Sequence, residues 1–111
     1  GFVFDSDSAY SNTTGKFTPQ TSGNYFIWAG CNDWYQGGAA TSRFVRVLKN
    51  GSDNICHVNM YMTASIRPIL FCSGIVTLNG SSDYVTTEVR QDDHNGPGQI
   101  YGYQFGGFRI T

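Results

Sequence analysis

The chain has 111 residues, a formal net charge of −1, 15% aromatic residues and only 14% charged residues. A chain of this length builds one core, so a single domain over residues 1–111 is expected, and the lack of clustered Lys and Arg excludes a nucleic-acid-binding surface. No run approaches the roughly 18 apolar residues of a membrane helix, so no membrane insertion is expected, and the many aromatics favour an apolar surface that meets another chain.

The predicted elements are all strands. They are expected at residues 1–5, 15–18, 24–30, 43–49, 55–62, 66–78, 83–90 and 100–111. Asn-Gly pairs at 50–51, 79–80 and 95–96 predict type I′ turns, and Pro68 indicates an edge or a bulge. No window has the helical period, so the chain is predicted to be all-β, as a sandwich or a barrel.

Four segments resemble one family in order and spacing. Residues 14–27 resemble the Gly-x-Phe-Thr…Gly-x-Tyr-x-Phe signature of complement C-one-q globular heads and their tumour-necrosis-factor relatives. Residues 45–51, 78–85 and 105–110 resemble the family's Lys-Asn-Gly hairpin, its Leu…Gly-Asp-x-Val segment and its closing Phe-x-Gly-Phe strand. Similar openings occur in the fibre tips of bacteriophages. The resemblance implies a two-sheet antiparallel jelly-roll sandwich that assembles as a homotrimer.

Two departures from the family pattern stand out. Ser82 replaces the Gly of Gly-Asp, and Ser22 stands where Pro is common. No collagen-like repeat precedes the domain in this chain, so complement-type assembly is not supported. These departures favour a remote relative, such as a viral one.

Strand alternation predicts which side chains meet at the threefold axis. If Tyr25 and Ile27 fill the core, as the family pattern implies, Phe26 and Trp28 point out of it. The same parity predicts that Phe108 and Ile110 face the core and that Phe105 and Arg109 face outward. Phe71 is placed outward as well, because Leu70 and Cys72 flank it. The trimer-interface candidates are therefore Trp28, Phe71, Phe105 and Arg109.

Two loops are candidates for ligand binding. Trp34 and Tyr35 stand in a segment flanked by glycines, where a flat apolar ring can bind a protein or stack on a sugar, or can fold back over its own sandwich. Asp92, Asp93 and His94 form a polar cluster. Asp92 and Asp93 offer oxygen ligands suited to calcium, and the alternative is a solvated turn.

The cysteines and histidines give no enzymatic pattern. Cys31, Cys56 and Cys72 allow either one disulfide with a free thiol or three reduced thiols. Cys56 and His57 are adjacent, so on a strand they point to opposite faces and cannot form a catalytic dyad. No closely spaced ligand pair suggests zinc. Sequons occur at Asn12, Asn50 and Asn79, and the last two coincide with predicted turns.

These observations favour a non-enzymatic, homotrimeric binding head. The first hypothesis is the receptor-binding tip of a phage tail or head fibre, on the virion surface, which engages a cell-surface glycan or protein. The alternatives are a structural trimeric cap or capsid decoration domain, and a secreted, extracellular C-one-q-like recognition or signalling head. No cofactor is expected, apart from the calcium hypothesis at Asp92 and Asp93.

Overall fold

The computed structural model describes residues 2–3, 9–11, 13–36, 41–62, 69–92 and 98–111. Its elements are β1 (Phe2–Val3), β2 (Tyr10–Ser11), β3 (Lys16–Phe17), β4 (Gly23–Gln36), β5 (Thr41–Lys49), β6 (Asp53–Met62), β7 (Leu70–Leu78), β8 (Val85–Asp92) and β9 (Gly98–Arg109). Within these residues the chain forms strands and no helix, which confirms the all-β prediction.

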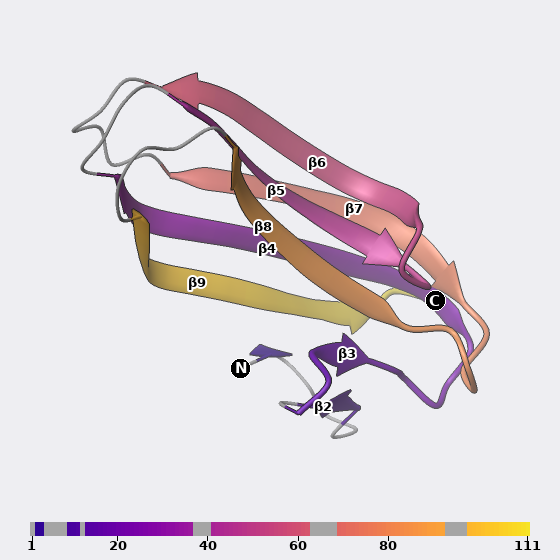
Figure 1. Cartoon of the computed structure of the whole chain (residues 1–111). Helices are drawn as coiled ribbons and strands as arrows, with labels where there is room; N and C mark the ends of the chain where they lie inside the picture. The colour runs from indigo at the N-terminus through magenta and orange to yellow at the C-terminus, as the bar shows by residue number, and fades with distance from the viewer. Residues whose placement is uncertain (1, 4–8, 12, 37–40, 63–68, 93–97) are drawn as a thin grey trace.

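The strands form two sheets, with the orders β1-β9-β4-β7 and β2-β3-β8-β5-β6. All neighbouring strands are antiparallel except β1, which pairs with β9 in parallel at two positions. The long strands of both sheets run along the length of the molecule, and the short β2 and β3 lie at one side (Figure 1). The structure is thus compatible with a two-layer β-sandwich.

The core fills the space between the two sheets. Tyr25, Ile27 and Ala29 of β4 are buried on one face, which confirms the predicted alternation of that strand. Val45 and Val47 of β5 face them from the second sheet and are fully buried. The remaining buried apolar members are Phe17, Cys31, Leu70, Cys72, Val76, Leu78, Val85 and Phe105.

One charged side chain also lies inside. Arg43 of β5 is 0% exposed, on the same face of the strand as Val45 and Val47. Burial lowers the pKa of this guanidinium from its usual value, because removal from water disfavours the charged form. The alternation of residues 43–49 shows a mixed pattern on both faces, so sequence alone did not single out this buried charge.

The predicted Asn-Gly turns have different outcomes. Asn50 and Gly51 both adopt positive φ, at 54° and 76°, and the Ser52 amide donates to the Lys49 carbonyl, so the type I′ hairpin is confirmed. At residues 79–80 only Gly80 has positive φ, and the segment joins β7 to β8 in the other sheet, so a type I′ hairpin is wrong there. The pair at 95–96 lies outside the described residues.

The predicted orientation of the last strand is also wrong. In the register of β9 against β4, Phe105 lies opposite Ala29 on the inward face, and Arg109 lies opposite Tyr25 at the end of the strand, where it is exposed. Phe105 is 1% exposed and packs edge-on against Tyr10 at 5.8 Å. Pairing with β4 places Phe105 on the inward face, the reverse of the face that the strand parity predicted for it.

Candidate functional site

The outward face of the β1-β9-β4-β7 sheet is unusually apolar. Strand register brings together on it Phe26 and Trp28 of β4, Phe71 and Ile75 of β7, and Phe108 of β9, here called the apolar face. Phe71, Ile75 and Phe108 are 54%, 65% and 48% exposed. Large apolar side chains grouped in this way on a sheet surface mark an interaction site more often than an ordinary solvated face.

The residues between these side chains are small or neutral. In the same register, the positions that share the face are Asn24, Gly30, Ser73, Thr77, Gln104 and Gly106. None of these described positions carries a formal charge. Depletion of charge with enrichment of aromatic residues is the composition found at the centre of protein interfaces.

The aromatic rings hold one another in place across the strands. The Phe26 ring lies 5.5 Å from that of Phe108 and 6.0 Å from that of Trp28, measured between centroids. The Trp28 indole lies over Gly106, where a β-carbon would collide with its ring atoms. Glycine at position 106 therefore lets the indole lie directly against β9.

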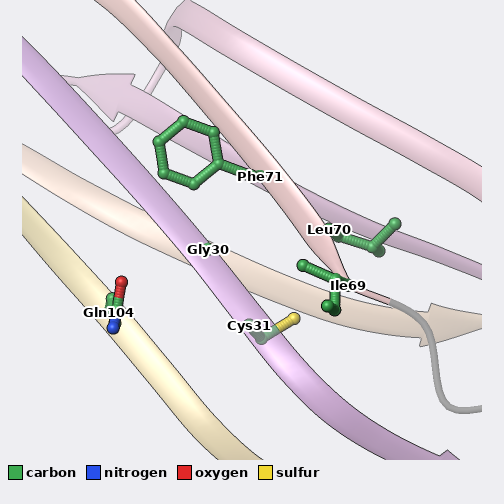
Figure 2. A pocket seen from close by; sticks show the side chains of 6 residues that line it. All are labelled: Gly30, Cys31, Ile69, Leu70, Phe71 and Gln104. Carbon is green, nitrogen blue, oxygen red and sulfur yellow. The ribbon is translucent and has the colours of Figure 1, made fainter.

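A shallow hollow of about 150 Å³ lies beside the apolar face. Figure 2 shows Phe71 on β7 and Gln104 on β9 on either side of Gly30, with Cys31, Ile69 and Leu70 completing the lining. The hollow is mostly apolar and small, so it suits a single side chain of a neighbouring molecule better than a cofactor.

The outward face of the other sheet has a different chemistry. Arg46 forms an ion pair with Glu88 at 2.7 Å, and its guanidinium lies 5.2 Å from the Phe44 ring centre. The His57 ring packs against Phe44 at 5.4 Å on the same face. The described part of this outward face thus carries an ion pair among its aromatic rings, unlike the apolar face of the β1-β9-β4-β7 sheet.

A polar network ties together the turns at one end of the molecule. Asn79 Oδ1 accepts hydrogen bonds from the amides of residues 81, 82 and 83, at 2.9–3.0 Å. Asp83 in turn accepts from the Asn50 side-chain amide and the Asn79 backbone amide, both at 3.0 Å, and lies 3.6 Å from Lys49 Nζ. Asn50 Oδ1 accepts from the Tyr84 amide. The side-chain amides at both predicted turns therefore have structural roles.

This network predicts a dependence of stability on pH. Hydrogen bonds from Asn50, with Asn79 and Lys49 adding to them, hold the pKa of Asp83 below its usual 3.8. Because the folded pKa is the lower one, the stabilisation is fully present above about pH 4 and is lost as the pH falls through the folded value. Thermal unfolding should be measured from pH 6 to pH 2. We expect the wild type to have a higher melting temperature than Asp83→Asn at pH 6, and the difference to disappear below pH 4. A constant gap would contradict this role.

The orientations predicted for the trimer-interface candidates have mixed outcomes. The outward orientation of Phe71 is confirmed, and Trp28 lies on the outward face, partly covered. Phe105 is a core residue, so its outward placement is wrong. Arg109 has the strand parity of Phe105 but is exposed at the end of β9, and its Nε donates to the Ser22 carbonyl of the same chain at 3.0 Å.

Two outward residues were missed by the sequence analysis. Ile75 has the parity of Phe71 on β7, and that signal could have found it. Phe108 was assigned to the core in place of Phe105, and the structure reverses the two.

The ligand-binding candidates lie largely beyond what the structure describes. Trp34 and Tyr35 belong to β4, opposite Ile100 and Gln99 of β9, and do not form a loop as expected. Their side chains are outside the described part of the chain, as is that of Asp92 at the end of β8. Asp93 and His94 lie outside the described residues altogether. Calcium binding there stays a prediction.

The cysteines are distributed as strand parity predicts. Cys56 lies opposite Val47 on the inward side and His57 lies opposite Arg46 on the outward side, which confirms that the two adjacent side chains point to opposite faces. Cys31 is buried, and burial raises its pKa to about 11. Cys56 and Cys72 meet across the two sheets, with their Sγ atoms 2.8 Å apart.

Comparison with known proteins adds no relative. The chain matches no known family, and no curated protein matches it. The described part of the chain contains no helix with the length and apolarity needed to cross a membrane.

Proposed function

We propose that the chain is a non-enzymatic jelly-roll head that assembles as a homotrimer and binds a cell-surface glycan or protein. The antiparallel strand pairs β3–β8, β4–β7 and β5–β6 support the jelly-roll topology. They are nested, so that early strands pair with late ones, as expected when a long double strand wraps around a sandwich. The pairs β4–β9 and β5–β8 then complete the two sheets.

The observation that carries the assembly proposal is the uncharged apolar face. A surface without charges cannot select a different partner by charge complementarity. It can pack against an identical surface without burying an unpaired charge. A second and a third copy of the chain bring the same aromatic groups, so we assign the face to contacts between copies. The Trp28 indole, flat over Gly106, leaves Phe71, Ile75 and Phe108 to make most of these contacts.

The proposed assembly leaves the ends of the sandwich available for a ligand. Trp34 and Tyr35 lie at one end of β4 and remain our candidates for contact with a receptor, because such residues supply large contact areas at low entropic cost. The setting we propose is a fibre tip on the virion surface, and the same head on an extracellular protein is the alternative.

Binding of labelled protein to a glycan array and to intact bacterial cells tests this function. We expect the wild type to bind, and Trp34→Ala with Tyr35→Ala to weaken binding at least about tenfold, as loss of two anchor residues does. The variant should sediment as the wild type does, and Tyr61→Ala on β6 serves as an exposed aromatic control. A wild type that binds neither probe would favour the structural cap instead.

A further inference from the structure

We propose that Cys56 and Cys72 form a disulfide that joins the two sheets when the protein meets a low-molecular-weight disulfide, such as oxidised glutathione, and that Cys31 stays free. The two Sγ atoms are hydrogen-bonded at 2.8 Å, so the two thiols are adjacent, and an S–S bond of roughly 2.05 Å needs only a small further approach. No other described pair of cysteines is in such contact. The inference does not depend on the proposed function, because both thiols face the interior of one chain.

The fold brings these thiols together at the open side of the sandwich. β6 is the last strand of one sheet and β7 the last strand of the other. Gly74 of β7 lies against Ile55 and Cys56, and a β-carbon there would stand only 3.0 Å from the Ile55 carbonyl oxygen. Glycine thus allows β6 to approach β7 closely, two residues along from Cys72. A bond here would link the two strands that stand last in the described sheets.

Cys31 is poorly placed to form a disulfide with Cys72 in place of Cys56. Cys72 pairs directly with Ala29, so Cys31 is its diagonal neighbour on the same face of the β4–β7 pair. Diagonal neighbours lie about 7–8 Å apart, beyond the roughly 7 Å that a disulfide spans between Cα atoms. Burial also raises the pKa of Cys31, which keeps it protonated and unreactive.

The exchange can proceed in two balanced steps. Cys56 is the more accessible thiol, and its hydrogen bond with Cys72 lowers its pKa while it raises that of Cys72. Its thiolate attacks one sulfur of oxidised glutathione, and one glutathione thiolate leaves. The Cys72 thiolate then attacks Cys56 Sγ and displaces the second glutathione. The protein loses two electrons and two protons, and one disulfide becomes two glutathione thiols.

Peptide mapping of the native protein after incubation with oxidised glutathione tests the proposal. We expect a single Cys56–Cys72 cross-link within one chain, with Cys31 alkylated only after unfolding. The closed loop of about 15 residues should raise the melting temperature by roughly 10 °C, and reduced glutathione should reverse the shift. Cys31→Ala is the matched control and should keep both the cross-link and the shift.

Two results would overturn the proposal. One is that Cys56 and Cys72 remain open to alkylation after oxidation of the folded protein. The other is that cross-links involve Cys31 or a second chain. Cys56→Ser should lose the melting shift, and if that variant fails to fold, the wild-type peptide map still decides the matter.

Discussion

Replacing Phe105 by Ala is expected to destabilise the chain by about 3–5 kcal/mol, a large part of the roughly 5–15 kcal/mol that holds a domain folded. The ring is 1% exposed and lies between the sheets against Tyr10, so its removal leaves a cavity that β9 and β4 cannot close. Urea unfolding monitored by circular dichroism measures the decrease in the free energy of unfolding.

Phe108 provides the matched control three residues along the same strand. Phe108→Ala removes the same ring from the outward face, where the side chain is already 48% exposed, and should cost the fold far less. Its main effect should be weaker association between copies. Equal losses of folding stability in the two variants would contradict the assignment of inward and outward faces on β9.

Ile75→Glu is expected to dissociate the assembly into folded monomers. The side chain is 65% exposed in the single chain and lies beside Phe26 on the apolar face, so the assembly would bury three unpaired carboxylates. Each uncompensated charge costs about 3–5 kcal/mol, which should raise the concentration needed for association at least a hundredfold. Size-exclusion chromatography with light scattering measures the mass at micromolar concentration.

Tyr61→Glu tests whether a charge at any exposed, largely apolar position would dissociate the assembly. Tyr61 is 70% exposed on β6 of the other sheet, so its exposure matches that of Ile75. We expect this variant to keep the mass of the wild type. If Tyr61→Glu dissociated the assembly and Ile75→Glu did not, the contact would lie on the sheet that contains β6, which would contradict our proposal.

The strands that alternate strictly could be predicted from the sequence. Tyr25 and Ile27 are inward, Phe26 and Trp28 are outward, and Leu70 and Cys72 flank the outward Phe71, as predicted. In such runs the side-chain period of two fixes the faces once one buried residue is known.

The faces of the last strand could not be predicted in this way. Phe105 and Phe108 are three residues apart, so they must lie on opposite faces, but two identical side chains do not reveal which one is buried. Only the register against β4, eighty positions earlier in the sequence, decides this. The local pattern contains no information about that pairing.

The end of β4 was missed for a similar reason. Residues 32–36 are polar and aromatic with glycines after them, which locally resembles a loop. The structure extends β4 through Gln36 because these residues pair with the first part of β9. Backbone hydrogen bonds between distant segments can stabilise a strand without an apolar alternation in its own sequence.

Sedimentation velocity of the wild-type protein at micromolar concentration tests the central claim most directly. Our account predicts a stable species of about 37 kDa, three copies of the 12.2 kDa chain, held together through the apolar face. The species should persist in high salt, because no described position on that face carries a charge. A single species of 12.2 kDa under these conditions would contradict the account.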